Sequence, residues 1–272
     1  MSNNFWKIFP VFLDVMFNEK TYNDVFSNAC TTGNIEMVNL LLELDQDPST
    51  NNKAIDVASE NGHVAVVDRL LQESQVDPSA ENNYAIRLDS LNGHINVVDR
   101  LLQDGRVNPS AFNNHAIRYA SLYGHVAVVD RLLQDMRVDP SAENNYAIRA
   151  ASENGHVAVV DRLLQNKEKR VDPSVYNNYA IQVASRNGHI DVVDRLLQDG
   201  RVDPSANNNY AIRSASLNGH IAVVNRLLQE QKNRVDPSDC NNFAFRCASE
   251  FKHVAVVNRL LQDTRVLLKI HA

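Results

Sequence analysis

Hydrophobic residues recur along the chain with the spacing of an amphipathic α-helix. After Gly124, a rotation of about 100° per residue places five aliphatic side chains on one broad face, namely Val126, Val128, Val129, Leu132 and Leu133. The opposite face carries small and polar residues, namely Ala127, Asp130, Arg131 and Gln134. This pattern predicts a short helix with one buried face and one face in water.

The same helical segment occurs eight times in the chain. The phrase GHVAVVDRLLQ or a close variant begins at seven positions, which are Gly62, Gly93, Gly124, Gly155, Gly188, Gly219 and Lys252. A divergent first copy, GNIEMVNLLLE, begins at Gly33. Self-similarity at intervals of 29 to 33 residues is typical of a solenoid, in which each unit packs on its neighbours. Constant residues are therefore expected to build the stack, and variable residues are candidates for specificity.

A second, shorter helix precedes each copy. In the unit DPSAENNYAIRAASENGHVAVVDRLLQ, which begins at Asp139, the Asp-Pro-Ser sequence predicts a turn. We expect a helix from about Asn145 to Asn154, with Asn144 or Asn145 capping its free amides. Gly155 is expected to end it in the left-handed conformation, and a second helix should cover about 157–165.

These residues carry a family resemblance. The segment NNYAIRAASENGHVAVVDRLLQ resembles the ankyrin repeat, with Gly155-His156 and Leu163-Leu164 in the places of that repeat's Gly-His and Leu-Leu pairs. The NNYAIR variant is similar to ankyrin arrays of protists and large DNA viruses. The resemblance implies an all-α, helix-turn-helix solenoid of about eight repeats. Because the unit is 31 residues where 33 is usual, the hairpin loops should be shortened.

The resemblance also assigns a role to a recurrent basic residue. Arginine, or glutamine in one unit, stands where the family's pattern has histidine, and the resemblance implies that it ties one repeat's loop to the next. The residues are Arg87, Arg118, Arg149, Gln182, Arg213 and Arg246.

The repeats define the domain organisation. We expect an ankyrin-like array over 22–265, an apolar capping segment over 1–21 and an apolar tail over 266–272. The apolar stretch 5–17 is too short to span a membrane and lacks the basic start of a signal peptide. This tail follows Arg265 and reads VLLKIHA. We expect one of three explanations for its apolar residues: they fold over the end of the array, they pair with another copy of the chain, or they mark the truncation of a longer array.

Charge and cysteine content narrow the classes of partner. The net charge of −6 argues against binding to nucleic acid or anionic lipid, both of which require clustered Lys and Arg. Three cysteines, Cys30, Cys240 and Cys247, form neither a disulfide framework nor a paired metal motif. A reducing, cytoplasmic location is expected, which is the host cytoplasm if the protein is viral.

The recurrent polar residues have structural explanations. Seven histidines lie one repeat apart, roughly 10 Å, which is too far for two of them to share a metal ion at about 2.1 Å. We expect each to bond a neighbouring loop. The recurrent Asp-Arg pairs, such as Asp161 and Arg162, are expected on a solvated outer face. No nucleophile recurs beside a base and no phosphate-binding loop is present, so we expect no enzyme, metal, cofactor or small-molecule substrate.

Residues that differ among the copies are the candidates for partner binding. One repeat concentrates aromatic and aliphatic side chains on its outward face, as interface hot spots do, although Tyr119 and Leu122 could instead pack sideways on adjacent repeats. The candidate residues are Leu91, Phe112, His115, Tyr119, Leu122, Tyr123, Glu153 and Arg186. Asp89 stands where other copies have alanine on the packed face, so it should find an arginine, remain protonated or distort its repeat.

Three functions are consistent with the sequence. The leading hypothesis is a non-enzymatic scaffold that binds a protein on the concave face and loops of the array. The alternative is a substrate adaptor for a ubiquitin ligase, because IFPVFLDVMF loosely resembles the start of an F-box, although only about twenty residues precede the first repeat. The third is a structural array without a dedicated partner. The sequence does not identify a partner.

Overall fold

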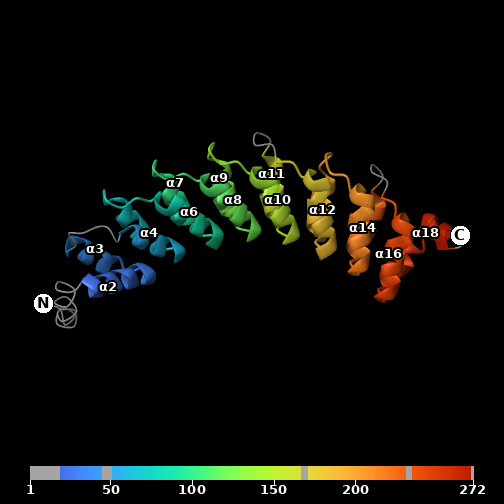
Figure 1. Cartoon of the computed structure of the whole chain (residues 1–272), viewed down its shortest axis with the longest axis horizontal. Helices are drawn as coiled ribbons and strands as arrows, with labels where there is room; N and C mark the ends of the chain where they lie inside the picture. The colour runs from blue at the N-terminus through green and yellow to red at the C-terminus, as the bar shows by residue number, and fades with distance from the viewer. Residues whose placement is uncertain (1–18, 45–50, 167–170, 231–234, 271–272) are drawn as a thin grey trace. The chain divides into compact units, whose positions relative to one another are not determined.

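The protein is built from α-helices. A computed structural model describes residues 19–44, 51–166, 171–230 and 235–270, and these ranges contain no β-strand (Figure 1). The helices are α2 (Glu19–Thr32), α3 (Ile35–Leu44), α4 (Asn51–Glu60), α5 (Val64–Leu71), α6 (Ala80–Asn92), α7 (Ile95–Leu102), α8 (Ala111–Leu122), α9 (Val126–Leu133), α10 (Ala142–Glu153), α11 (Val157–Gln165), α12 (Val175–Asn187), α13 (Ile190–Leu197), α14 (Ala206–Leu217), α15 (Ile221–Gln229), α16 (Asp239–Glu250), α17 (Val254–Leu260) and α18 (Thr264–Ile270).

The helices from α2 to α17 form eight consecutive pairs, which confirms the all-α repeat architecture. The chain divides into two compact units. Unit 1 holds residues 1–116 and 134–138, and unit 2 holds residues 117–133 and 139–272, so the division falls within α8. In unit 2, the first helices α10, α12, α14 and α16 pack against one another in series (Figure 1). Most of the segment expected to cap the array, 1–18, lies outside the described residues, as does the F-box-like stretch within it.

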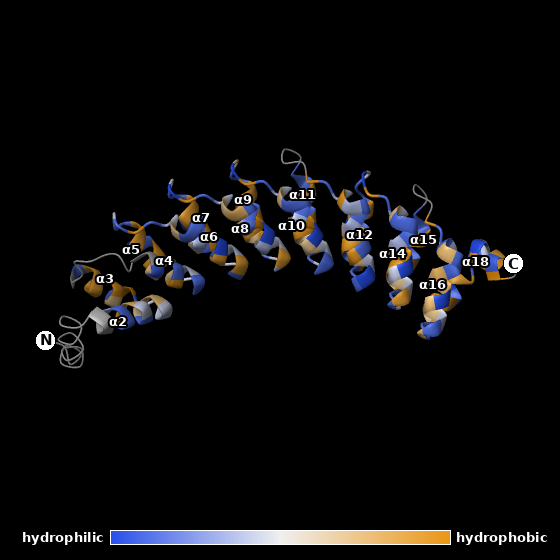
Figure 2. Ribbon diagram, in the orientation of Figure 1, coloured by the Kyte–Doolittle hydropathy of each residue, from blue (hydrophilic) through white to orange (hydrophobic). Residues whose placement is uncertain are grey.

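The core follows the hydrophobic pattern of the sequence. In the second helix of a pair, Val159, Val160 and Leu163 are buried, and in the first helix Ala147 and Ile148 are buried. Small alanines let the first helices approach closely, while each fully buried valine, leucine or isoleucine contributes about 1.5–3 kcal/mol. Figure 2 shows apolar and polar residues side by side on the helices. Each repeat therefore buries its apolar side chains against its own helix pair and its neighbours.

The start of the first helix differs from the sequence-based expectation. In α10, Glu143, Asn144 and Asn145 have φ values of 53°, 55° and 59°, so three consecutive residues are left-handed. The same turn occurs in six repeats, from α6 to α16. Asparagine tolerates this conformation better than most residues. The Asn pair is therefore not an N-cap but part of a left-handed turn, closed by the N–H of Asn145, which donates to the carbonyl of Ser141 at 2.7 Å.

The second Asn of each pair joins neighbouring repeats. The Asn145 side chain is 7% exposed, and its Oδ1 accepts the backbone N–H of Asp172 at 2.8 Å, at the start of the next Asp-Pro-Ser turn. Equivalent bonds join Asn83 to Asn108, Asn178 to Asp203 and Asn209 to Asp236. The recurrent turn thus supplies an acceptor to a partly buried backbone N–H of the following repeat.

The Gly-His corner also joins neighbouring repeats, as expected for the histidines. Gly155 has a φ of +77°, and the ring of His189 from the next repeat lies 2.7 Å from the place where a Cβ on Gly155 would be. The Nε2 of His189 in turn bonds the carbonyl of Glu153 at 3.0 Å. Glycine is required here both by the backbone conformation and by the ring that covers it. Five further histidines bond a carbonyl of the preceding repeat: His63, His94, His156, His220 and His253.

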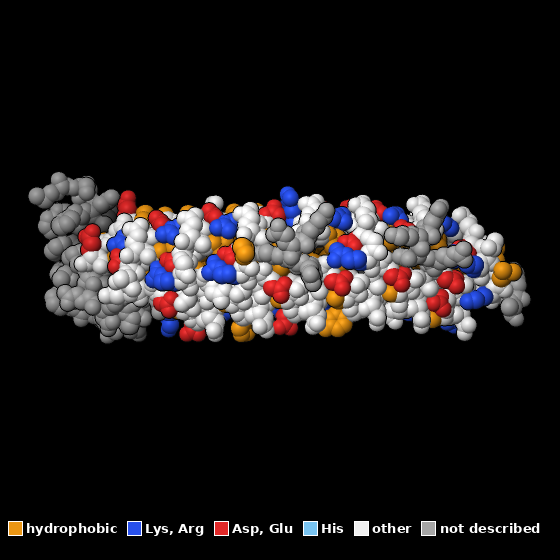
Figure 3. Space-filling view, turned by 90° about the horizontal axis from the view of Figure 1, so that it is seen from above, with side chains coloured by type: hydrophobic (Ala, Val, Ile, Leu, Met, Phe, Trp, Pro, Cys, Tyr) orange, Lys and Arg blue, Asp and Glu red, His pale blue; other side chains and the backbone are white. Residues whose placement is uncertain are grey.

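Charged residues form a ladder along the second helices. Arg195 Nε donates to Asp161 Oδ1 of the preceding repeat at 2.5 Å, and the same pairing joins Arg100 to Asp68 and Arg226 to Asp194. Both partners of each pair remain partly exposed, so each contributes at most about 1 kcal/mol. Figure 3 shows acidic and basic side chains interspersed over one face. The expected solvated outer face is therefore also an inter-repeat ladder.

The last described helix, α18, packs on α16. Val266 is fully buried, whereas Leu268 is 72% exposed and Ile270 is 42% exposed. Val266 thus packs against the end of the array, as one of the alternatives for the tail expected, whereas Leu268 and Ile270 remain at the surface. Among the described residues, no helix is both long and apolar enough to cross a membrane.

Candidate functional site

The predicted binding residues lie on or directly after first helices. Leu91 (α6), Phe112 and His115 (α8) belong to unit 1. The others belong to unit 2 and are Tyr119, Leu122, Tyr123, Glu153 and Arg186. Phe112 is 62% exposed and Tyr123 is 52% exposed, while the remaining six side chains are partly buried. The predicted set therefore contains two prominently exposed aromatic side chains.

Phe112 is held on a rigid turn. It is the first of the three left-handed residues of its repeat, with φ 54°, a conformation that a bulky side chain rarely adopts. The guanidinium of Arg87 lies 5.0 Å from its ring centroid, and the His115 ring lies 5.9 Å away. The cation–π contact fixes one face of the ring and leaves most of the side chain in water. Phe112 is therefore presented in a defined position.

Tyr119 and Tyr123 have different surroundings. The Tyr119 ring stacks on Tyr146 of the next repeat, with centroids 6.5 Å apart and an interplanar angle of 26°. Tyr119 thus packs sideways, the alternative that the sequence left open. Tyr123 stacks on His125 at 6.4 Å and remains exposed, as Phe251 does on His253 in the last repeat.

Glu153 and Arg186 bind each other. Arg186 Nη2 donates to Glu153 Oε1 at 3.0 Å, so the two predicted site residues form an ion pair between α10 and α12. The backbone carbonyl of Glu153 also accepts bonds from Asn187 Nδ2 and His189 Nε2. The pair leaves little uncompensated charge at this point of the surface.

Asp89 is buried beside a histidine. Its side chain is fully buried, and its Oδ1 lies 3.3 Å from Nδ1 of His94. Burial raises the pKa of the Asp89 carboxyl to about 8, the Ser59 hydroxyl opposes this rise, and the Asp56 charge adds to it. His94 uses Nδ1 to reach the Ser59 carbonyl, whereas the other five histidines use Nε2. The sequence left three outcomes open for Asp89, and the raised pKa favours the one in which its carboxyl is protonated. The residue beside the carboxyl is His94, not an arginine.

The recurrent arginines reach the next repeat through ring contacts, whereas their hydrogen bonds lie within their own repeat. Arg149 Nε donates to the carbonyl of Asn144 at 3.1 Å and Nη2 donates to that of Glu143, so its hydrogen bonds stabilise the left-handed turn of its own repeat. Its guanidinium reaches the next repeat through ring contacts, 4.9 Å from the Tyr176 centroid and 5.7 Å from that of Tyr179. The physical reason is that the three left-handed residues turn their carbonyls toward the arginine of the same repeat.

Sequence reasoning missed two features of this surface. An aromatic residue directly follows the Asn pair in most units, and the recurrent arginine stacks on it, as Arg213 does on Tyr210 at 5.6 Å. Tyr176 occupies the same turn position as Phe112, is 58% exposed and was not among the predicted residues. Alignment of the repeats on their Asn pair would have revealed both features. It shows the Asn-Asn-aromatic-x-x-Arg spacing and places Tyr176 in the same position as Phe112.

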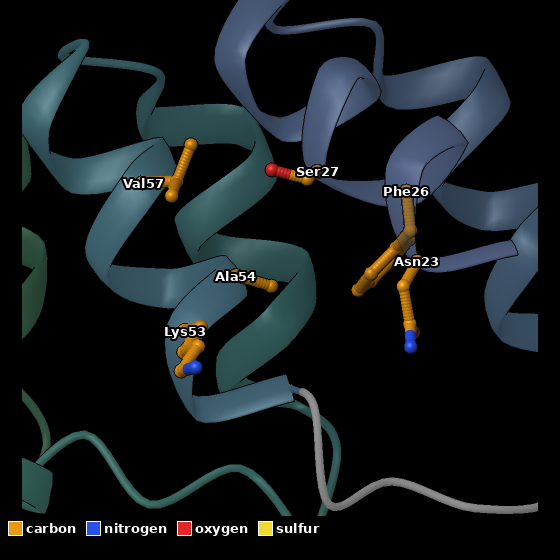
Figure 4. Close-up of a pocket in the computed structure, with 6 residues that line it drawn as sticks. All are labelled: Asn23, Phe26, Ser27, Lys53, Ala54 and Val57. Atoms are coloured by element: carbon orange, nitrogen blue, oxygen red, sulfur yellow. The ribbon is translucent and has the colours of Figure 1, made fainter. Parts of the chain in front are cut away.

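A small pocket lies in unit 1, between α2 and α4. It has a volume of about 220 Å³ and is lined by Asn23, Phe26, Ser27, Lys53, Ala54 and Val57 (Figure 4). This is below the range of about 300–1,000 Å³ usual for small-molecule sites. Within the described ranges, no three His, Cys, Asp or Glu side chains come together as metal ligands.

Comparison with known proteins identifies the family. A family model for ankyrin repeats in three copies matches residues 120–208 and 181–269, together more than half of the chain. No curated protein matches the sequence. The X-ray structure of an ankyrin repeat family protein from Legionella pneumophila is 19% identical, with a TM-score of 0.38, over 91% of this chain and 71% of that one. This structural similarity is too low to support an assignment of fold or function. On the match to the family model, and in agreement with the eight helix pairs, the chain belongs to the ankyrin-repeat family.

Proposed function

We propose that the protein is a non-enzymatic scaffold that binds a protein partner through the first helices of its repeats and the turns that precede them. Proteins built from ankyrin repeats are typically protein-interaction modules. The observation that carries the proposal here is the presentation of Phe112, an exposed aromatic ring fixed by Arg87 on a turn of rigid geometry. Aromatic side chains anchored in this way lose little conformational entropy on binding.

The energetic basis of the proposal is preorganisation. Each left-handed turn is fixed by hydrogen bonds within its repeat, from Arg149 for example, and to the next repeat through Asn145. A partner therefore meets a surface whose backbone is already ordered. The partner's identity is not encoded in these contacts.

The test is affinity purification from a cell lysate with protein identification by mass spectrometry. The test variant Phe112→Ser/Tyr123→Ser removes both exposed aromatic side chains of the predicted set. The control variant Met136→Ser/Phe251→Ser removes two exposed side chains outside it, of which Phe251 matches Tyr123 in its exposure and its histidine contact. We expect a partner that the parent and the control retain and the test variant loses. The same proteins on all three baits, or none on the parent, would contradict the proposal.

A further inference from the structure

In unit 2, the first Asn of each pair contributes to the turn through its backbone, but its side chain has no contact that explains the choice of asparagine. In unit 2 these residues are Asn144, Asn177, Asn208 and Asn241, and all four are exposed. Their carboxamides make no hydrogen bond within the described chain, in contrast to the second Asn of each pair. The left-handed conformation alone does not demand asparagine, because the preceding left-handed position holds Glu143, Tyr176, Asn207 and Cys240 in the same repeats.

A row of aromatic rings accompanies these carboxamides. Two residues after each exposed Asn stands an aromatic residue, partly buried, one in each repeat: Tyr146, Tyr179, Tyr210 and Phe243. Arg149 connects the two sets, because its Nε bonds the Asn144 carbonyl and its guanidinium lies 5.7 Å from both the Tyr146 and Tyr179 centroids. Unit 2 therefore carries one free carboxamide and one aromatic ring per repeat along a single edge.

The period of this surface matches one conformation of a peptide. Packed neighbouring helices lie about 8–10 Å apart. Three residues of a polyproline II helix rise about 9.3 Å and complete one turn, so every third residue faces the same side. Three residues of a β-strand span a similar length, but side chains alternate, so every third residue faces the opposite side. A polyproline II ligand would thus present an equivalent residue to each repeat.

The chemistry of the surface fits the same ligand. Proline residues offer backbone carbonyls but no N–H groups, and a carboxamide NH₂ donates to a carbonyl. Aromatic residues line the grooves in which proline-rich segments dock. Here Arg149 and Arg213 cover part of the rings, and the part of each ring that remains exposed is the surface available to a ligand. We propose that the Asn-aromatic edge of unit 2 binds a proline-rich segment of a protein partner in the polyproline II conformation, with about three ligand residues per repeat. The proposal rests on the proposed scaffold function and specifies its ligand.

The test uses the full-length protein and a fluorescent twelve-residue oligoproline, with a Gly/Ser peptide of equal length as the flexible control. The key variant is Asn144→Gly/Asn177→Gly/Asn208→Gly/Asn241→Gly, because glycine keeps the left-handed conformation and removes the carboxamide. Anisotropy titration should show oligoproline binding to the parent and a loss of at least about tenfold in affinity in the variant. The control variant Asn154→Gly/Asn218→Gly, at exposed Asn residues bonded within their own helices, should bind as the parent does.

The possible outcomes separate the two proposals. Equal affinity of the parent for both peptides, or unchanged oligoproline affinity in the fourfold variant, would overturn the polyproline II assignment. If circular dichroism shows that the fourfold variant is unfolded, the double variant Asn144→Gly/Asn177→Gly replaces it, with an expected loss of about threefold or more. If the parent protein retains a cellular partner but does not bind oligoproline, the scaffold function is supported and the proposed polyproline II ligand is refuted.

Discussion

Asp89 occupies a position that is alanine in neighbouring repeats, such as Ala58 and Ala120, and its carboxyl is buried within unit 1. The pKa of about 8 in the folded state lies above the ordinary aspartate value of 3.8, so the folded state holds the proton more tightly than the unfolded chain. The contribution of this group to stability is therefore largest below pH 4. It is lost progressively as the pH rises from about 4 to about 8.

We predict that Asp89→Ala stabilises the protein at alkaline pH. At pH 8.5 the free energy of unfolding should increase by roughly 3–6 kcal/mol, because the variant no longer ionises or buries a carboxyl. At pH 4 the gain should be small. Urea unfolding at the two pH values measures both, and a gain that is independent of pH would contradict the assignment of a raised pKa.

The corner glycines combine two constraints at one residue. Gly155 is left-handed and lies under the His189 ring, whereas Gly105 has open space around it. Lys252 stands at the equivalent corner of the last repeat with φ 59°, where the described chain places no histidine of a following repeat. The Cβ is thus tolerated where the ring is missing.

We predict that Gly155→Ala lowers the free energy of unfolding by about 2–3 kcal/mol, through left-handed strain and displacement of the His189 ring. The control Gly105→Ala should be neutral or stabilising by up to about 1 kcal/mol. Chemical denaturation of both variants provides the comparison. Equal effects at the two sites would show that the histidine contact is unimportant.

At the level of the helix, the two residues of the Asn pair in the left-handed turn contribute differently to the free energy of unfolding. Asn144→Ala and Asn145→Ala carry the same conformational cost, but only the second leaves the partly buried N–H of Asp172 without its acceptor. We predict that Asn145→Ala destabilises the protein by about 1–3 kcal/mol more than Asn144→Ala does. Matched losses in thermal or urea unfolding would argue against the inter-repeat bond.

The ladder of the second helices should respond to salt. Asp161→Ala removes the partly exposed partner of Arg195, and we expect a loss of less than about 1 kcal/mol at low ionic strength. The loss should nearly vanish at 1 M salt, where the screening length is about 3 Å. A large, salt-independent loss would mean that the pair is effectively buried.

The helix pairs, their Gly-His corners and their apolar faces were predictable from the sequence, because each follows from the spacing of residues such as Val159, Val160 and Gly155. The left-handed turn was not, since Asn144 and Asn145 favour both N-caps and left-handed positions and periodicity does not separate the two. The neighbours of Asp89 and Tyr119 depend on contacts between repeats, which local pattern does not specify. Whether the predicted surface residues bind a partner stays a prediction.

At the scale of the whole molecule, neighbouring repeats within a unit are joined by several independent contacts of modest strength. In unit 2, the repeat of α10 is linked to that of α12 through Asn145, His189, Arg195 and the stacked Arg149. Repetition of these contacts lets surface positions vary without loss of the fold. Exposed residues such as Phe112 and Asn177 are thus available for binding.

The most direct test of the scaffold function is site-specific photo-crosslinking in cells. A photoreactive phenylalanine analogue replaces Phe112 in one experiment and Met136, which is 93% exposed, in the control. We predict a discrete adduct with a second protein from position 112 and none from position 136. Adducts of the same proteins from both positions, or none from position 112 in cells that express the protein at its natural level, would contradict it.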